Sequence, residues 1–405
     1  MKKKLFIVLF LLSLVGPTFV WPFLRGHLDD TNYENRQLAE FPELSAENFE
    51  QIPSQFEAYY NDHVPFKNLF VKVKTKLDLK LLGQSSNSAV TVGEDNWMFY
   101  TSSIEGEDAL ADYQRTNLYT EEQEEALKAS ILSAKEQTES RGMRFFVFQA
   151  PNKETIYGEY MPDSTEQFGE VSRLDAVIPR LQEAGLPVYD MKAALLEAKA
   201  VLEKKAAPEA ESELAAENGD LPPAGAKQTL YYKYDTHWNQ IGAFAGSQMM
   251  SEILTGTGIP FEAVDFQPEI HCSGDMARML NLAEEYSDDW TWVTEDYLPE
   301  ITAECVEGTP AGEFSVFESD SSNGKTLLLV GDSFSQALKP YLAKLYRRSI
   351  FVTIETYEKS VLENYPADDF VYLTVERNQK TFEDMGNILL REEAEGGIRQ
   401  TTDGF

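Results

Sequence analysis

The chain has 405 residues, 42% of them hydrophobic, and a formal net charge of −33 at pH 7. This length and composition allow one large domain or two ordinary ones with a packed core. The acidic charge argues against nucleic acid as a partner, because phosphate binding needs a basic surface. The 4 histidines and 2 cysteines lack the spacing of metal ligands, so we expect neither a metal site nor another cofactor.

The N-terminal segment, residues 1–25, has the pattern of a targeting or membrane segment. Three lysines precede an uncharged, largely apolar run from Leu5 to Leu24. Such a run is typical of a signal peptide or of a single membrane anchor. Because it ends without a convincing small-x-small cleavage site, we predict an uncleaved, single-pass anchor with the rest of the chain outside the membrane. A cleaved and secreted form is the alternative.

Residues 26–90 are predicted to form an N-terminal helical extension, with an amphipathic helical pattern near residues 49–60. The stretch VTVGEDNWMFYTS that follows predicts a short hairpin with its turn at Gly93 to Asn96. A charged helix is expected over residues 120–140, with Gly142 as its stop signal.

Strands and helices then alternate through the rest of the chain. The runs MRFFVFQAP, LPVYDM, KTLLLVGDS, SIFVTIET and DDFVYLTVER suit strands, and helical patterns lie between them. This alternation predicts an α/β domain over residues 91–405, with a mostly parallel sheet covered by helices on both faces. Residues 205–228, rich in Ala, Glu and Pro, are expected to form an exposed loop within it. No separate carbohydrate-binding module is expected after this domain.

The two cysteines, Cys272 and Cys305, lie outside the membrane in this interpretation. An oxidising compartment would permit a disulfide between them, and two free buried thiols are the alternative.

The stretch YYKYDTHWNQIGAF, residues 231–244, contains one of the few histidines. If this segment is extended, Asp235 and His237 point to the same side, because side chains alternate along a strand. The carboxylate of Asp235 could then orient the imidazole of His237. Such a pair needs only a nucleophile to complete a catalytic triad.

The stretch TLLLVGDSFSQ supplies a candidate nucleophile in Ser333. A glycine just before a serine, between a strand and a helix, is how α/β hydrolytic folds expose a hydroxyl near backbone N–H groups. Many serines in this position only cap a helix. Combined with the Asp-x-His pair, however, the pattern predicts a triad in which Ser333 attacks, His237 takes its proton and Asp235 orients the imidazole.

With GDSF after an apolar strand and YDTHWNQIGA before it, the chain resembles the SGNH-hydrolase-like alginate O-acetyltransferases of the AlgJ/AlgX type and the related DHHW family of membrane-anchored wall proteins. Further matches between residues 33 and 380 are ENRQLAEFPEL, NDHVPFKN, VGEDNWMFY, APNKETIYGEYMP, SGDMARML and LTVERN. The resemblance implies a flavodoxin-like fold and the same three roles for Asp235, His237 and Ser333. One departure is Thr236, where the DHHW motif has histidine.

The resemblance also implies a function. It indicates an extracytoplasmic O-acetyltransferase that modifies a cell-surface polysaccharide, with a multi-pass membrane O-acyltransferase as its acyl donor. We expect a neutral or amino-sugar polymer, because an acidic surface disfavours a polyanion. An acetyl esterase with the same triad and a non-catalytic cell-wall assembly protein are the alternatives.

Three further residues are candidates for substrate binding or for an oxyanion site. Trp238 could stack on a sugar ring, although a tryptophan in this position is more often part of the core. Arg377 could bind an acceptor or an acyl oxyanion, or simply pair with Glu376 or another carboxylate. Asn152 is a candidate for the oxyanion site, together with Asn239 and Asn378.

Overall fold

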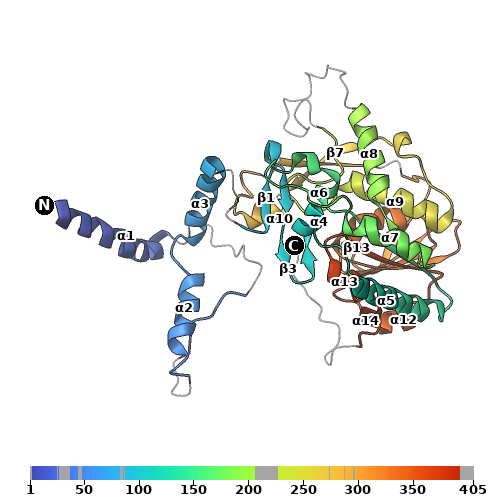
Figure 1. Cartoon of the computed structure of the whole chain (residues 1–405), viewed down its shortest axis with the longest axis horizontal. Helices are drawn as coiled ribbons and strands as arrows, with labels where there is room; N and C mark the ends of the chain where they lie inside the picture. The colour runs from blue at the N-terminus through green and yellow to red at the C-terminus, as the bar shows by residue number, and fades with distance from the viewer. Residues whose placement is uncertain are drawn as a thin grey trace.

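The computed structural model describes residues 2–24, 26, 37–43, 48–82, 85, 87–205, 227–272, 274–286, 288–294 and 297–392. Its central element is a seven-stranded sheet (Figure 1). The strands, in spatial order, are β6 (Val188–Asp190), β5 (Arg144–Ala150), β13 (Asp369–Val375), β11 (Thr326–Gly331), β12 (Arg348–Thr353), β10 (Phe314–Ser319) and β9 (Ala303–Gly308). Neighbours from β6 to β12 pair in parallel, whereas β10 and β9 are antiparallel at one edge. The predicted mostly parallel sheet is therefore confirmed.

Both faces of this sheet are covered by helices. One face packs against α5 (Glu121–Glu139), α7 (Arg173–Glu183), α12 (Ser360–Asn364), α13 (Gln379–Glu383) and α14 (Met385–Ile388), and the other against α8 (Lys192–Lys205), α9 (Gln240–Thr255) and α11 (Lys339–Leu342). Alternate residues of β11 serve the two cores: Leu327 and Leu329 face one, and Leu328 and Val330 the other. A strand buried on both sides needs an unbroken apolar run, which explains TLLLV.

Smaller elements surround the sheet. The predicted hairpin is confirmed, with Val92 of its first strand opposite Met98 of its second. These elements are β1 (Val90–Val92), η2 (Glu94–Asn96), β2 (Met98–Tyr100), β3 (Ser103–Ile104), β4 (Glu107–Asp108), α4 (Ala109–Gln114), α6 (Lys153–Ile156), η3 (Gly158–Tyr160), η4 (Phe261–Ala263), β7 (Gln267–Cys272), α10 (Asp275–Met279), β8 (Asp288–Val293) and η5 (Ser333–Leu338).

Side-chain caps fix where several helices begin. Thr120 and Ser172 each form a capping box at the start of α5 and α7. Asn239 caps α9, because its Oδ1 accepts from the N–H groups of Ile241 and Gly242. Asn239 is thus occupied as a cap, which argues against the oxyanion role considered for it.

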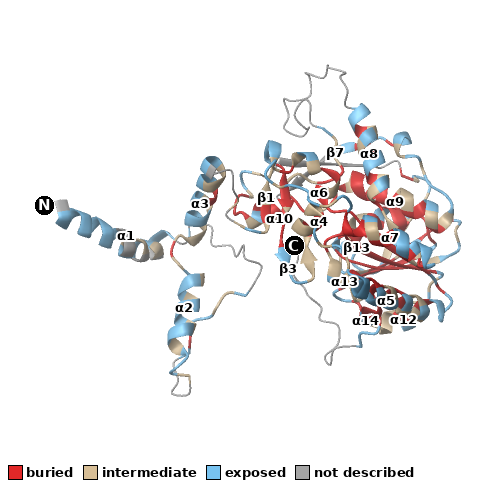
Figure 2. Cartoon of the chain, in the orientation of Figure 1, coloured by how far each residue is buried: buried red, intermediate tan, exposed pale blue. Residues whose placement is uncertain are grey.

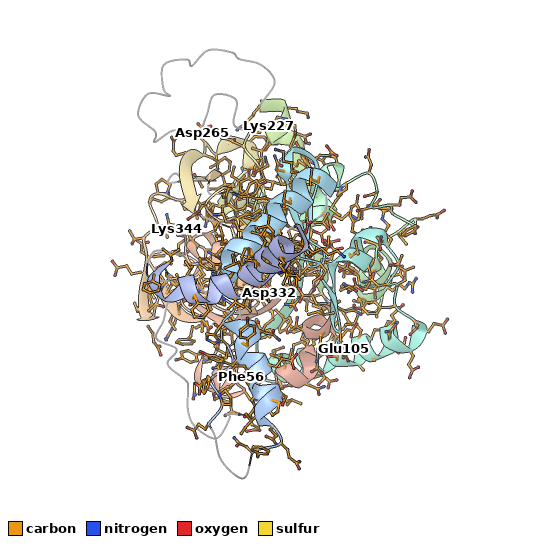
Figure 3. All side chains as sticks on the ribbon, turned by 90° about the vertical axis from the view of Figure 1, so that its left-hand side faces the viewer. Phe56, Glu105, Lys227, Asp265, Asp332 and Lys344 are labelled. Atoms are coloured by element: carbon orange, nitrogen blue, oxygen red, sulfur yellow. The ribbon has the colours of Figure 1, made fainter. Side chains whose placement is uncertain are left out.

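The N-terminal helices α1 (Lys2–Leu24), α2 (Ile52–Asp62) and α3 (Lys67–Leu82) project from the α/β body (Figure 1). Many of their side chains are exposed (Figure 2), including Phe56 of α2, which Figure 3 labels. Lys72 of α3 contacts Glu284 of the body at 2.6 Å. Within the described residues, none of the helices combines the length and apolar content that crossing a bilayer requires. The anchor predicted for residues 1–25 stays a prediction.

Cys305 on β9 is a free thiol, and its Sγ–H donates to the carbonyl oxygen of Glu307 at 3.3 Å. The disulfide expected for Cys305 is therefore not formed in this structure. The side chain of its expected partner, Cys272, lies outside the described residues, as does most of the loop predicted for residues 205–228.

Candidate active site

The turn after β11 exposes Ser333 and is held by the carboxylate of Asp332. Asp332 Oδ1 accepts from the N–H of Phe334 at 3.0 Å, and its Oδ2 accepts from the N–H of Val375 at the end of β13 at 2.6 Å. At the preceding glycine, Gly331, a Cβ would lie 2.8 Å from that of Ser335. The sharp turn therefore requires glycine, and buried Asp332 fixes the serine relative to the neighbouring strand.

A continuous chain of hydrogen bonds joins the three residues predicted to act together. Ser333 Oγ lies 2.8 Å from His237 Nε2, and His237 Nδ1 lies 2.7 Å from Asp235 Oδ1. These distances allow a serine to transfer its proton to an imidazole that a carboxylate orients. The segments lie 96 residues apart in sequence and meet at the carboxyl edge of the sheet.

The local geometry of the Asp-x-His pair differs from the expected strand. Between Tyr231 and Trp238, which form an isolated antiparallel bridge, the chain bends instead of running extended. Asp235 meets His237 because its Oδ1 also accepts the backbone N–H of His237 at 2.9 Å. A side-chain-to-backbone turn, rather than the alternation of a strand, therefore brings the two side chains together.

A second carboxylate, Asp275, lies beside the pair and was missed by sequence reasoning. Its oxygens accept from the backbone N–H of Thr236 at 2.8 Å and from the Thr236 hydroxyl at 2.6 Å. The backbone N–H of Asp275 donates to Asp235 Oδ2 at 3.0 Å, and its own Oδ2 lies 3.7 Å from His237 Nδ1. Thr236, where the DHHW motif has histidine, thus bonds to Asp275 through both its backbone N–H and its hydroxyl. The only sequence signal was SGDM, noted as a motif without a role.

The two carboxylates, Asp235 and Asp275, affect the pKa of His237. Burial alone lowers it, but the hydrogen bond and charge of Asp235, with the charge of Asp275, outweigh burial and raise the pKa above its ordinary value. Because the base must be neutral to accept a proton, activity that depends on His237 should be lost as pH falls through a value above 6.5.

Asp275→Asn is expected to shift this acid limb to lower pH, because a negative charge that raises the pKa of His237 disappears. The measurement is the pH profile of kcat/KM for 4-nitrophenyl acetate, with Glu284→Gln as an exposed control. An unchanged inflection in the Asp275 variant would contradict the charge effect assigned to this residue.

Lys153 holds the loop that carries the pair. Its buried ammonium donates to the backbone carbonyls of Tyr232, Lys233 and Asp235, the last at 2.8 Å. The hydroxyl of Tyr231 donates to the carbonyl of Pro151, which adds a second link. The segment that follows β5, with Pro151 and Lys153, therefore positions the loop that carries Asp235 and His237.

Trp238 belongs to the core beneath the serine turn. It is 1% exposed, and its indole N–H donates to the carbonyl of Phe334 at 3.0 Å. The indole packs so closely on α9 that a Cβ at Gly246 would lie 3.1 Å from the ring. This burial favours packing over the stacking on a sugar ring that was considered for Trp238.

Arg377 and Asn152 follow two adjacent strands, β13 and β5. The guanidinium of Arg377 pairs with Glu107 at 3.2 Å and lies 5.3 Å from the ring centroid of Phe334, the residue after Ser333. Asn152 Oδ1 accepts from the N–H of Arg377, and its buried Nδ2 has no partner among the described residues. Because β5 lies two strands from β11, about 10 Å away, Arg377 is the better placed of the two for the predicted oxyanion role. Asn378 instead donates to Asp332 at 3.3 Å.

Glu154, in α6, is buried, and the carboxylates of Glu376 and Asp112 lie near enough to influence its pKa. Burial raises its pKa to about 8. A folded-state pKa above the ordinary value of 4.5 means that the folded chain binds the proton more tightly than the unfolded chain. The contribution of protonated Glu154 to the free energy of unfolding is therefore fully present below pH 4.5 and is lost as pH rises through about 8.

Glu154→Gln should remove this loss, so the variant should be more stable than the wild type at pH 8.5, by a few kcal/mol, and similar to it at pH 5. Denaturant unfolding at the two pH values measures the difference, and exposed Glu122→Gln is the control. Equal stabilities at pH 8.5 would mean that Glu154 is not a buried, proton-binding group.

A cavity of about 720 Å³ opens beside the hydrogen-bonded chain. It is lined by Tyr232, Asp235, His237, Trp238, Gln240, Ala303, Pro310, Ala311, Phe317, Ser333, Gln336, Ala337, Lys339, Pro340, Ala343 and Lys344. Its volume is in the range of small-molecule sites and exceeds what an acetyl group alone would fill. The space therefore allows a further part of a substrate to lie next to Ser333.

Asp235, His237 and Asp275 have ligand atoms that lie within 4.8 Å of one another, a spacing that could hold a metal ion. These atoms already bond to one another and to Thr236. We therefore interpret them as a hydrogen-bonded unit, and the absence of a metal stays a prediction.

The sequence profile of one protein family, described as "SGNH hydrolase-like domain, acetyltransferase AlgX", matches residues 90–205 and 210–359. Among solved structures, a DHHW family protein from Eubacterium siraeum is 16% identical, with a TM-score of 0.51 over 76% of this chain and 98% of that one. The O-acetyltransferase domain of Pseudomonas putida AlgJ is 14% identical (TM-score 0.42; 78% and 97% covered), and Bacillus cereus PatB1 is 15% identical (TM-score 0.45; 72% and 97% covered). No match was found among curated proteins.

Proposed function

Because the chain belongs to the family of SGNH hydrolase-like acetyltransferases represented by AlgX, we propose that it transfers an acetyl group through an acyl-serine intermediate at Ser333. The observation that carries this proposal is the unbroken chain from Ser333 Oγ through His237 to Asp235, with contacts of 2.8 and 2.7 Å. An exposed serine hydroxyl beside a carboxylate-oriented imidazole is the arrangement that nucleophilic acyl transfer needs.

The first half-reaction loads the serine. The Ser333 hydroxyl gives its proton to His237 Nε2 while its oxygen attacks the carbonyl carbon of the acyl donor. The tetrahedral intermediate then expels the donor oxygen, which takes the proton from His237, and an ester at Ser333 remains. Asp235 stays ionised throughout and stabilises the imidazolium. We propose that the guanidinium of Arg377, which lies close to the serine turn, stabilises the oxyanion of this intermediate.

The second half-reaction reverses these steps with a different oxygen. His237 removes the proton from an acceptor hydroxyl, that oxygen attacks the acyl-serine carbonyl, and Ser333 leaves as its hydroxyl after regaining the proton. We propose that the acceptor is a sugar hydroxyl of a cell-surface polysaccharide. The donor in this proposal is a multi-pass membrane O-acyltransferase.

We place this reaction outside the cytoplasm, with the N-terminal segment as a membrane anchor. The uncharged run behind the lysines supports this location. Anchoring would raise the effective concentration of the domain near a donor in the same membrane.

The second candidate is an acetyl esterase, because Ser333 is exposed and water could reach the acyl-serine in place of a sugar. The two activities differ only in the acceptor, so they share every residue of the proposed site.

The test is turnover of 4-nitrophenyl acetate by the purified protein beside Ser333→Ala, with and without neutral oligosaccharides. Serine-dependent release of 4-nitrophenol that increases with the sugar, together with acetylated sugar, supports transfer. Release without sugar acetylation favours the esterase. A folded protein with no Ser333-dependent turnover would favour the non-catalytic assembly protein.

A further inference from the structure

Helix α3 differs in charge from the rest of the chain. Its sequence, KNLFVKVKTKLDLKLL, has a single carboxylate, Asp78, and five lysines: Lys67, Lys72, Lys74, Lys76 and Lys80. Five positive charges and one negative charge give α3 a formal net charge of +4, whereas the whole chain has −33. Exposed charges are screened beyond about 10 Å in salt, so this local positive charge can act despite the acidic total.

One face of α3 packs against the α/β body. Thr75 is fully buried, and Leu79 packs against the apolar cluster formed by β1, β2 and α10. Lys72 pairs with Glu284 at 2.6 Å and with Glu285 at 3.1 Å. These contacts hold α3 in one orientation, with its opposite face turned away from the body (Figure 1).

The opposite face of α3, which we call the outer face, is apolar and exposed. Its side chains are 46–72% exposed, and they are Leu69, Phe70, Val73, Leu77 and Leu81. Four of the five recur every four residues, so they follow one side of the helix (Figure 2). Soluble proteins rarely expose a continuous apolar surface unless it binds a partner or a membrane.

Lysines border the outer face. At 3.6 residues per turn, Lys74 and Lys76 lie on its two sides, and Lys80 lies in its last turn. Lys74 pairs with Asp78 at 2.6 Å, but its side chain stays 65% exposed. An apolar stripe bordered by lysines is typical of a helix that lies in a membrane interface, with its apolar side chains among the acyl chains and its lysines at anionic headgroups.

The start of α3 lies beside the end of α1. The ring of Trp21 in α1 contacts the ring of Phe66, directly before α3, at 5.4 Å between centroids. Tryptophan is enriched where a membrane segment meets water. If the N-terminal segment is the anchor proposed above, α3 therefore begins at the membrane surface.

We propose that the outer face of α3 binds the surface of a bilayer that contains anionic lipid, with Lys74, Lys76 and Lys80 at the headgroup phosphates. A second copy of the chain fits this face less well, because a symmetric contact would bring two cationic helices together. Binding through α3 would hold the α/β body beside the membrane. The proposal does not depend on the chemistry at Ser333.

The test places a polarity-sensitive NBD fluorophore at Leu77→Cys in the full chain, with Cys272→Ser and Cys305→Ser so that only one thiol is labelled. The protein is floated with vesicles of phosphatidylcholine, alone or with about one-third phosphatidylglycerol, whose acyl chains carry nitroxide quenchers. We expect blue-shifted emission and quenching with the anionic vesicles, because position 77 enters the interface. Flotation reports attachment by any segment, and the probe reports contact by α3.

Lys74→Gln combined with Lys80→Gln should lower the ratio of quenched to unquenched probe by about 25-fold, from about fivefold for each lysine. The matched control combines Lys204→Gln and Lys325→Gln, two exposed lysines in α8 and before β11. It removes the same charge from the body and should leave the ratio unchanged. Circular dichroism must show that each variant is folded.

Three results would overturn the proposal. A chain that floats with an unquenched probe is held by another segment, and a chain that floats with neither vesicle has no lipid-binding face. A blue shift that follows protein concentration, not anionic lipid, would assign the outer face to a second copy. Equal quenching in the Lys74 and Lys80 variant and in its control would exclude the lysines as headgroup contacts.

Discussion

Asp235→Asn is expected to lower kcat/KM for 4-nitrophenyl acetate by about 10³–10⁴-fold while leaving the fold intact. Both carboxylate oxygens act as acceptors: Oδ1 for the ring and backbone N–H of His237, and Oδ2 for the N–H of Asp275. The NH₂ group of an asparagine would replace one acceptor oxygen and would face an N–H group of His237 or Asp275, which it cannot accept. The imidazole would then lose its orientation, its tautomer, or both.

The matched control is Asp265→Asn, an exposed aspartate in the segment before β7. It makes the same chemical change away from the site and should retain wild-type rates. An Asp235→Asn variant within tenfold of the wild type would contradict the role assigned to this carboxylate. Circular dichroism and thermal unfolding must show that both variants are folded.

Trp238→Ala is expected to destabilise the protein by about 3–5 kcal/mol, the range for removing a large buried aromatic side chain. The indole is almost fully buried, and its N–H satisfies the carbonyl of Phe334 in the serine turn. Its removal would leave a cavity and would take one hydrogen-bond donor away from the buried carbonyl of Phe334. The measurement is the free energy of unfolding from denaturant titration.

Trp238→Phe separates packing from the hydrogen bond. It retains much of the ring volume and should lose about 1–3 kcal/mol, mainly because the Phe334 carbonyl loses its donor. If Trp238→Ala instead unfolds with wild-type stability and only sugar binding weakens, Trp238 would be a stacking residue and the core assignment would be wrong.

Much of the sheet could be predicted because its strands have a simple physical requirement. A parallel strand covered on both faces must be largely apolar, and most positions of β11 (TLLLVG) and β13 (DFVYLTV) are. The Gly-Asp-Ser turn could also be predicted from its glycine, because the tight contact at Gly331 excludes a side chain there. The candidate nucleophile could therefore be found from a strand, a glycine and a serine.

The surroundings of the candidate site could not be predicted in the same way. Asp275 reaches Asp235 across 40 residues, and Lys153 reaches the same loop across 82. Such contacts depend on how loops fold over the sheet, and no local periodicity encodes them. The pairing of Asp235 with His237 was expected for the wrong reason, because a turn replaces the strand. Burial likewise decided between the two interpretations of Trp238.

The central claim, a covalent acyl-serine at Ser333, is tested most directly by intact-mass analysis of the purified protein. The sample is quenched in acid within milliseconds of mixing with 4-nitrophenyl acetate, and the modified peptide is then sequenced. We expect a mass increase of one acetyl group on Ser333, which disappears on incubation and is absent from Ser333→Ala. A folded, active protein that never carries the acetyl group, or that carries it equally in Ser333→Ala, would contradict the account.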